Sequence, residues 1–366
     1  MIPADFITEW RAHARWSADE QVEQDLVLCR ALVEIFDDAE LAVSVSLRGG
    51  TALHKLYFAP ARRYSEDIDI VQMQPGPIGT TIDRLRAKLD QWLGVPRWER
   101  GEGVRLIYRF ESEIPPVVRL RLEIEANTRE HFTVRGVTRR PFAVDSRWWR
   151  GDASITTFEI EELLGTKLRA LFQRRKGRDL FDLCVALEAG IDPAAVVEIF
   201  RTYMKRGGRH VTRALFEENL AGRIDQPAFT EDVPRLLPPG VTFDVAAGAE
   251  RSQRELIALL PGDPWLGKPG PYAQARARFS LIFATFAPPG RRLPSAGPVR
   301  PVVVVPTARL ARLPPRGRSR LPRAHALAVR RGSGPGCGSR EVPAEAARRD
   351  KTFLSRRERT CPVLRP

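Results

Sequence analysis

Stretches that alternate apolar and polar residues mark the half-buried strands of this chain. Residues 43–47, VSVSL, alternate in this way, and so do residues 67–70, DIDI. The longest example is residues 117–127, where every second residue from Val118 to Ala126 is apolar. Shorter strands are predicted over residues 104–110, 132–137 and 142–144. Strands with one apolar face are typical of an antiparallel or mixed sheet that packs on helices.

Apolar residues that recur every three or four positions predict the helices that cover this sheet. Ser17 and Glu20 have the spacing of a capping box, and an apolar stripe of helical period follows them. More helices are predicted over residues 52–58, 81–93 and 158–190, with a break at Gly177, and over segments up to residue 265. We therefore expect an α+β fold, with a mixed β-sheet domain and its N-terminal helix over residues 1–150. A helical domain over residues 151–265 would form the second wall of a substrate-binding cleft beside this sheet.

The net charge of +14 suggests a nucleic-acid-binding protein until the charges are placed along the chain. Residues 266–366 hold 22 Lys and Arg against 4 Asp and Glu, whereas residues 1–265 hold 37 against 41. The first 265 residues therefore have the composition of a mildly acidic globular protein, and they are numerous enough to bury a substantial core.

Residues 266–366 differ from the rest of the chain in composition as well as in charge. They contain 15 of the 30 prolines and no sustained apolar period, so we expect a disordered tail. The tail is either a nucleic-acid-binding arm or non-native sequence, translated from GC-rich DNA in a shifted frame. The abrupt change in composition favours the second interpretation.

Cysteine usage and hydropathy exclude several classes of protein. No Cys-x-x-Cys spacing is present, so neither a zinc site nor a disulfide framework is indicated. The charged N-terminus does not have the pattern of a signal peptide. No apolar run approaches the roughly 20 residues that a membrane span needs. We expect a cytoplasmic protein with no membrane contact.

Residues 48–71, RGGTALHKLYFAPARRYSEDIDIV, carry the clearest chemistry. On a strand, Asp67 and Asp69 point to the same face about 7 Å apart, with the isoleucines turned to the core. Two adjacent carboxylates repel each other, and a divalent cation held between them removes that penalty. The turn at Gly49 and Gly50 opens a helix whose backbone N–H groups can bind an anion. The pattern predicts a metal–nucleotide site; the alternative is an exposed Asp-x-Asp at a strand end.

The same residues resemble the first motif of the DNA-polymerase-beta-like nucleotidyltransferase superfamily, a Gly-Gly or Gly-Ser turn followed by Asp-x-Asp. The longer pattern resembles one branch of it, the AbiEii/MenT-type toxins of bacterial toxin–antitoxin and abortive-infection systems. That pattern is Gly-Gly-Thr-Ala-Leu at residues 49–53 and Arg-x-Ser-x-Asp-x-Asp at residues 63–69. The resemblance implies that Asp67 and Asp69 are catalytic and bind two Mg²⁺ ions. It also implies that the NTP is contacted by Gly49, Gly50, Thr51, Arg63 and Ser65.

A third carboxylate is expected from the strand over residues 117–127. Glu123 and Glu125 lie on one face of this strand, and either can supply it. The resemblance favours Glu125 as a catalytic and metal-binding residue, because residues 124–130, IEANTRE, are similar to the family's Ile-Glu-Ile-Asn-x-Arg-Glu. The alternative is cross-strand ion pairing with arginines on the same face.

Residues 161–183 hold the second group of candidates. Asp179 and Asp182 are three residues apart, so they share a helix face, and Lys167 lies on the preceding helix. A lysine and an acid beside a carboxylate-floored cleft can neutralise phosphate and orient a substrate hydroxyl. The alternative is a solvated, charged helix surface. The order Lys, then Arg-x-Lys-x-Arg-Asp-x-x-Asp, again resembles the AbiEii/MenT-type pattern. It implies that Lys167 and Asp182 are catalytic and that Lys167, Arg178 and Asp179 bind nucleotide.

With this resemblance, the residues predict a Mg²⁺-dependent nucleotidyltransferase that moves NMP from an NTP to an acceptor and releases diphosphate. The resemblance implies a tRNA 3′ end or a protein hydroxyl as acceptor. It also implies the toxin of a type IV toxin–antitoxin or abortive-infection system, restrained by a cognate antitoxin that is encoded nearby. The alternatives are a small-molecule nucleotidyltransferase of the aminoglycoside-modifying type and a non-catalytic nucleotide-binding module.

Overall fold

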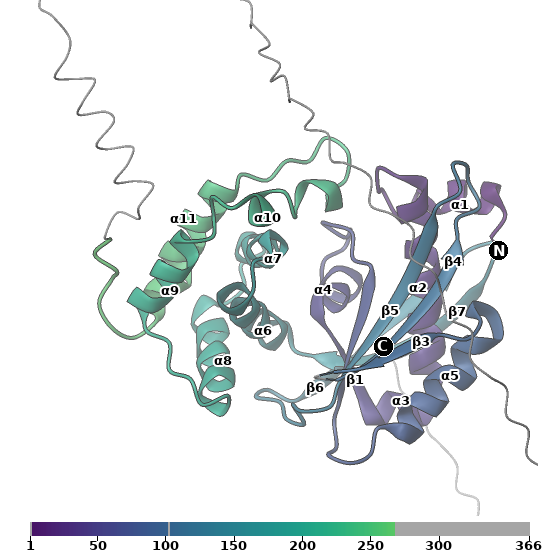
Figure 1. The fold of residues 1–366 in the computed structure, drawn as a ribbon, viewed down its shortest axis with the longest axis horizontal. Coiled ribbons are helices and arrows are strands. Elements are labelled where there is room, and N and C mark those ends of the chain that lie inside the picture. The colour runs from purple at the N-terminus through teal and green to yellow at the C-terminus, as the bar shows by residue number, and fades with distance from the viewer. Residues whose placement is uncertain (1, 102, 268–366) are drawn as a thin grey trace, which may run out of the picture. The chain divides into compact units, whose positions relative to one another are not determined.

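A seven-stranded mixed β-sheet organises the described part of the chain (Figure 1). The structure is a computed structural model that describes residues 2–101 and 103–267. Across the sheet the strand order is β3-β4-β5-β2-β1-β7-β6. Strand β2 is antiparallel to β1 and parallel to β5, and β1 is parallel to β7. The strands are β1 Val45–Arg48, β2 Asp67–Gln72, β3 Arg97–Arg100, β4 Val104–Glu111, β5 Arg119–Asn127, β6 Val137–Asp145 and β7 Arg150–Phe158.

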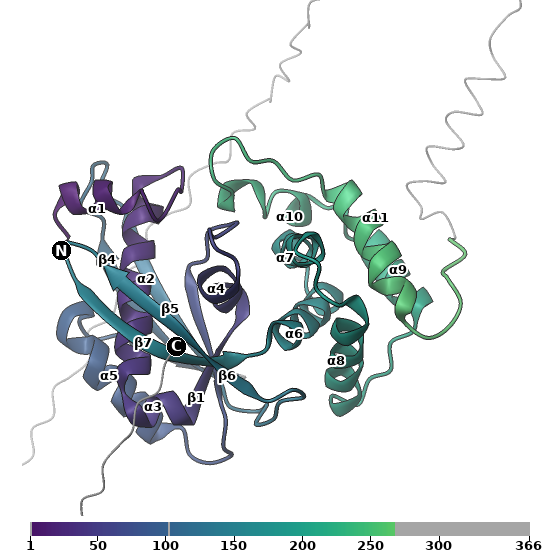
Figure 2. The same cartoon turned by 180° about the vertical axis from the view of Figure 1, so that it is seen from behind.

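The helices form two groups around this sheet (Figures 1 and 2). The group packed with the sheet comprises α1 Ala4–Trp10, α2 Asp19–Asp37, α3 Ala39–Ser44 and α5 Gly79–Leu93. The other group comprises α6 Ile160–Gln173, α7 Gly177–Glu188, α8 Pro193–Arg206, α9 Arg213–Ala221, α10 Pro227–Thr230 and α11 Val245–Glu255. Helix α4, Gly49–Ala52, continues as a π-helix, Leu53–Tyr57, and contacts β2 as well as α6. The predicted α+β fold with a mixed sheet is therefore confirmed.

The two faces of β2 and β5 have different chemistry, because side chains alternate along a strand. Ile68, Ile70 and Ile124 are buried on the face that packs against α2. The opposite face carries the acidic residues of both strands, and these are only partly buried. The sequence pattern that defines the core thus also determines which face can carry polar chemistry.

Several predicted elements differ from the structure at their ends. Residues 43 and 44 end helix α3, because the Asp38 carboxylate caps that helix by accepting from the backbone N–H of Glu40 and Leu41, both at 3.0 Å. Strand β1 therefore begins only at Val45. The capping box at Ser17 is wrong, since α2 begins after Ala18 and has no side-chain cap.

The predicted strand over residues 132–137 is also absent until Val137. The backbone N–H groups of Val134 and Arg135 donate to the buried Glu162 carboxylate, at 2.8 Å each. A side chain thus satisfies these donors without a neighbouring strand. The predicted break at Gly177 between two helices is confirmed by α6 and α7.

The described residues all lie in one compact unit. The division into domains at residue 150 stays a prediction. The predicted disorder of residues 266–366 lies outside the described residues, apart from Leu266 and Gly267. Within residues 2–101 and 103–267, each helix is too short or too polar to span a lipid bilayer.

Candidate active site

Four carboxylates lie together on the polar face formed by β2 and β5. The parallel register pairs Asp67 with Glu123 and Asp69 with Glu125, and residues paired in this way point to the same face. Arg105 of β4 contacts both glutamates, with Nε 2.6 Å from Glu123 and Nη2 3.3 Å from Glu125. Both alternatives for these glutamates, metal ligand and cross-strand ion pair, are therefore compatible with their positions, and the choice of third carboxylate stays a prediction.

Asp67 is the most perturbed of these acids. Burial, together with the charges of Glu66, Asp69 and Glu123, raises the pKa of Asp67 to about 7, although the charge of Arg178 acts in the opposite direction. Within the described residues, neither Asp67 nor Asp69 forms an ion pair with a basic side chain. Of the four carboxylates on this face, the two glutamates contact Arg105, and the two aspartates of β2 are left without an ion-paired counter-charge.

The Gly49 position makes room for the second acid. A Cβ atom at Gly49 would lie 2.0 Å from Asp69 Oδ2, and the backbone of Gly49 has a φ of +81°. Only glycine meets both conditions, because a side chain would displace the carboxylate and strain the backbone. The Gly-Gly turn and the Asp-x-Asp pair are thus parts of one packed arrangement.

These acids fit a divalent cation such as Mg²⁺, which prefers carboxylate oxygens and would relieve the repulsion that raises the pKa of Asp67. Asp67 and Asp69 would hold it, with Glu123 or Glu125 beside them. In the described part of the chain, no group of three or more His, Cys, Asp and Glu side chains is already gathered for metal binding.

Hydrogen bonds connect the Gly-Gly turn to the residues around the Asp-x-Asp pair. The Thr51 hydroxyl is fully buried and lies 2.5 Å from the carbonyl oxygen of Asp67 and 2.9 Å from the Ser65 hydroxyl. Thr51 thus fixes the start of β2 against the glycine turn. Direct contact between the NTP and Thr51 or Ser65 stays a prediction.

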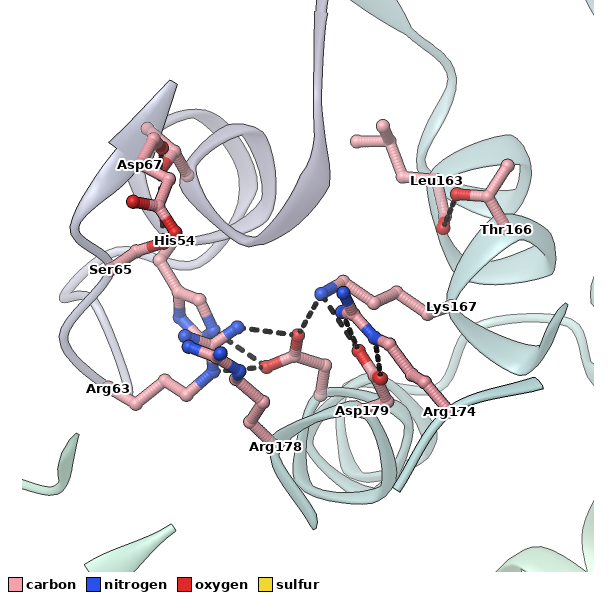
Figure 3. A network of polar contacts seen from close by, with 12 residues as sticks. His54, Arg63, Ser65, Asp67, Leu163, Thr166, Lys167, Arg174, Arg178 and Asp179 are labelled. Atoms are coloured by element: carbon pink, nitrogen blue, oxygen red, sulfur yellow. Dashed lines mark hydrogen bonds and ion pairs between the residues drawn. The ribbon is translucent and has the colours of Figure 1, made fainter. Parts of the chain in front are cut away.

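A buried ion cluster joins the loop before β2 to helix α7 (Figure 3). Arg63 donates to both oxygens of Asp182, from Nε at 2.7 Å and from Nη2 at 2.8 Å, and its Nη1 donates to the carbonyl of Tyr64. Both charged side chains are almost completely buried. The buried charge of Arg63, with that of Lys167, holds the pKa of Asp182 well below its usual range despite burial. Arg63 is therefore placed to hold the loop, and its predicted contact with nucleotide stays a prediction.

Lys167 joins this ion pair to a second one. Its Nζ lies 3.0 Å from Asp182 Oδ2 and 3.2 Å from Asp179 Oδ1. Arg174 in turn donates to both oxygens of Asp179, at 2.7 and 2.8 Å. The structure thus brings together the three residues that the sequence proposed on α6 and α7.

The charges of this cluster do not cancel. Asp179 and Asp182 each have their own arginine in two-point contact, so these four groups are neutral as pairs. Lys167 is then the remaining charge, and the cluster carries one net positive charge. A buried surplus charge favours an anion nearby, because desolvation is otherwise uncompensated.

His54 completes the cluster and was not recognised in the sequence, where it has the features of a lone structural histidine. Its Nδ1 accepts from the backbone N–H of Arg62 at 3.3 Å, so the neutral ring carries its proton on Nε2 and donates to Asp182 Oδ1 at 2.9 Å. Burial and the charge of Arg63 lower the pKa of His54 to about 4, so the ring is neutral at pH 7. The available signal was its position one helical turn after Gly50.

Basic residues at the end of α6 and the start of α7 lie near the acids of β2. The charge of Asp69 contributes to the raised pKa of Arg174, after the larger effect of the hydrogen bond with Asp179. The charge of Arg178 in turn acts to lower the pKa of Asp67, against burial and the neighbouring acids. The buried Asp232 orients Arg178 by accepting from its backbone N–H at 3.0 Å. Acids on the sheet thus lie opposite arginines on the helical side.

A third ion cluster ties the two sequence motifs together through Glu130. Its carboxylate contacts Arg48, at the end of β1, at 2.5 Å, and Arg169 of α6 at 3.1 Å. Asn127 caps the intervening turn by accepting from the backbone N–H of Arg129 and Glu130. Although burial acts to raise it, the hydrogen bonds and charges of Arg169 and Arg48 lower the pKa of Glu130 to about 2.

We expect Glu130→Gln to lower the free energy of unfolding by about 2–3 kcal/mol at pH 7. Because the folded pKa is depressed, the contribution of Glu130 is fully present above the unfolded pKa of 4.5 and is lost as the pH falls through about 2. The difference between wild type and variant in urea unfolding should therefore shrink between pH 4.5 and pH 2. A difference that is constant over this range would contradict the assignment.

Comparisons with known proteins show a family to which most of the described chain is similar. A model of the nucleotidyl transferase AbiEii toxin family, described as belonging to type IV toxin–antitoxin systems, matches residues 30–249. Among solved structures, the chain is similar to MenT4, a nucleotidyltransferase toxin from Mycobacterium tuberculosis, at 16% identity and a TM-score of 0.47, covering 78% of this chain and 98% of that one. It is also similar to a protein from H. pylori assigned provisionally as a nucleotidyltransferase, at 18% identity and a TM-score of 0.40, covering 67% and 100%. At these TM-scores the two structures add nothing to the family match. No curated protein matches the chain.

Proposed function

The chain belongs to the AbiEii family of nucleotidyltransferase toxins, and from that premise we propose that it is the Mg²⁺-dependent toxin of a type IV toxin–antitoxin system. It transfers NMP from an NTP to a tRNA 3′ end or a protein hydroxyl, and a cognate antitoxin encoded nearby restrains it. Transfer as the type of reaction follows from the family. The metal, the acceptor and the system are the proposed parts.

One observation carries this proposal: the acids of β2 lie opposite the basic residues of α6 and α7. A triphosphate with its counter-cation is an elongated object, negative along its oxygens and positive at the metal. Asp67 and Asp69 match the positive part, and Arg174 and Arg178 match the negative part. If the charged residues of α6 and α7 formed only a structural ion-paired surface, two carboxylates without ion pairs, Asp67 and Asp69, would not be needed opposite them.

The protein groups act mainly by positioning and by neutralising charge, as phosphoryl-transfer chemistry requires. Bound Mg²⁺ would lower the pKa of the attacking hydroxyl and stabilise the leaving diphosphate. Asp67 and Asp69 on strand β2 would hold the cation. The backbone N–H groups of Gly49 and Gly50 lie at the start of α4 beside Asp69 and bind phosphate oxygens. The acceptor hydroxyl attacks the α-phosphorus, and the bond to the diphosphate breaks.

Lys167 supplies the surplus positive charge that the phosphates meet on the helical side. Asp179 and Asp182 orient its ammonium group, from 3.2 and 3.0 Å, without neutralising it, because each of them is already paired with an arginine. Thr51, Arg63 and His54 also fix the protein backbone: Thr51 holds the glycine turn against the start of β2, and Arg63 and His54 anchor the loop before β2 and the start of the motif to Asp182 of α7.

We expect Lys167→Met to lower the rate of nucleotide transfer about a hundredfold to a thousandfold, a range found when one charge-stabilising donor is removed. It should lower the free energy of unfolding by less than about 2 kcal/mol, because both carboxylates keep their arginines. Single-turnover transfer and urea unfolding measure the two effects. Lys176→Met is the matched control. The Lys176 side chain is 43% exposed, and its ion pair with Asp232 is long, at 3.7 Å, so its removal should have little effect. A large loss of stability with an unchanged rate per folded molecule would make Lys167 purely structural.

The acceptor is identified by incubating the full chain with Mg²⁺, total tRNA and each of the four α-³²P-labelled NTPs. We expect label on tRNA or on protein, from one preferred NTP, and no label with Asp67→Ala. Label on an added aminoglycoside alone would replace the toxin proposal by small-molecule modification. Tight NTP binding without any labelled product would leave a nucleotide-binding module.

A further inference from the structure

A cavity lies beside the buried ion cluster and contains none of the proposed catalytic residues. Its volume is about 660 Å³, within the range of ligand sites. Residues 11–16 before α2, residues 60–62, helix α7 and residues 238–243 line it. Residues 238–243 belong to the segment between α10 and α11 that passes over α7 in Figures 1 and 2.

Aromatic side chains form the floor of this cavity. The rings of Phe181 and Phe243 meet edge to face, with centroids 5.2 Å apart. Trp16 is buried beside them, and Val241 stays 47% exposed at the rim. Phe243 remains partly exposed in the cavity, whereas Phe181 and Trp16 are buried. A partly exposed aromatic surface is suited to a planar ring, which stacks with little dependence on its identity.

Arginines surround this floor, and two of them lack a counter-charge. Arg11 is occupied by Asp19 and by the carbonyl of Trp16. Arg15 and Arg62 are exposed and form no ion pair with any residue between 2 and 267 that the structure describes. The acid of the lining, Glu188, faces Arg251 at 3.5 Å. The cavity therefore combines an aromatic floor with uncompensated positive charge, which fits a phosphate-bearing ring system.

The cavity shares two segments with the active site. Arg63 and Asp182 form the buried ion pair, at 2.7 and 2.8 Å. The residues directly before them in the sequence, Arg62 and Phe181, line the cavity. The loop and helix that hold the catalytic cluster on one side thus line the cavity on the other. A ligand that continues from the cavity around the loop at residues 60–63 would reach the cleft.

We propose that this cavity binds a nucleotide of a single-stranded RNA acceptor, a short distance before the reacting end, with its base on Phe243 and its phosphates on Arg15 and Arg62. This inference rests on the proposed transfer function, whose acceptor it narrows to RNA. An RNA strand, rather than a free nucleotide, is favoured for two reasons. The cavity does not include the residues to which the NTP is assigned, and it is lined by residues directly next in sequence to Arg63 and Asp182 of the buried ion cluster.

The test uses the full chain and an eight-nucleotide RNA with 4-thiouridine near its 3′ end, followed by photo-crosslinking and peptide mapping. We expect crosslinks within residues 11–16 and 238–243, with a yield about tenfold lower in Arg15→Ala/Arg62→Ala. The matched control is Arg201→Ala/Arg209→Ala, two exposed arginines beside another cavity, and it should change the yield less than twofold. The basic residues 266–366 are common to all three proteins, so crosslinked peptides rather than total binding locate the site.

Four results would overturn the inference. Crosslinks elsewhere, or equal losses in both double variants, would mean that the cavity does not select RNA. Displacement of the RNA from these peptides by equimolar mononucleotides would assign the cavity to a free nucleotide, and displacement by an acidic peptide would assign it to a protein segment. Crosslinks at the cavity without transfer of label to any RNA or protein would instead refute the proposed function and leave this binding site standing.

Discussion

Replacing Asp67 with asparagine is expected to lower nucleotide transfer at least about a thousandfold while the fold stays intact. Asparagine has the same shape but one charge less, so the β2 face loses a cation ligand without a steric change. The unfolding free energy at pH 8 should not fall, because burial and the neighbouring acids raise the pKa of Asp67 to about 7 and make its charged form unfavourable. Transfer rates and thermal unfolding in the absence of Mg²⁺ measure the two effects separately.

Asp69→Asn should give the same loss of transfer, since Asp69 lies on the same face and packs on Gly49. The matched control is Glu111→Gln, which removes an exposed carboxylate at the far end of β4 in the same sheet. It should leave the rate within about twofold, because a single surface charge changes little beyond a Debye length. Wild-type rates in either aspartate variant would remove the metal–nucleotide site from the β2 face.

Asp182→Ala is expected to lower the free energy of unfolding by about 3–5 kcal/mol, the largest stability effect in the described chain. The substitution leaves Arg63 buried with its Nε and Nη2 groups unpaired, and it also removes the acceptor of His54 and one partner of Lys167. Transfer should fall as well, because the loop before Asp67 is no longer fixed. Urea unfolding at pH 7 measures the loss, and Asp83→Ala, an exposed acid on α5, is the control.

A double variant that removes both buried charges tests whether the unpaired charge of Arg63 causes the stability loss in Asp182→Ala. Arg63→Met combined with Asp182→Leu removes both buried charges, and apolar replacements of similar volume are often neutral or stabilising. We expect the double variant to recover at least half of the stability lost in Asp182→Ala, without recovering transfer. If the double variant were as unstable as the sum of the two single variants, the loss would come from packing and not from an unpaired charge.

The polar face of the sheet follows from local sequence because a strand alternates with a period of two. Asp67 and Asp69 had to share a face once Ile68 and Ile70 were buried, and the same alternation placed Glu123 and Glu125 together. The break at Gly177 was also visible. Local rules failed where a side chain far along the chain satisfied backbone groups, as Glu162 does at residues 134 and 135.

The contacts that make these residues a site join distant positions. Arg63 and Asp182 are 119 residues apart, and Glu130 meets Arg48 over 82 residues. No periodicity encodes such pairs, since they depend on how α7 and α6 pack against the sheet. The sequence therefore showed an Asp-x-Asp motif and a Lys–Asp–Asp motif, but not that Lys167 is left with the surplus charge.

The α+β class, the carboxylate face and the nucleotidyltransferase resemblance can be read from the amino-acid sequence, because each depends on neighbours within a few residues. The packing of distant segments is needed to see that His54 belongs to the cluster, that Arg105 contacts both glutamates of β5, and that a basic aromatic cavity lies behind Asp182. Each of these arises from segments brought together across the fold. Burial, charge compensation and shape are properties of that packing, and they do not exist until the chain has folded.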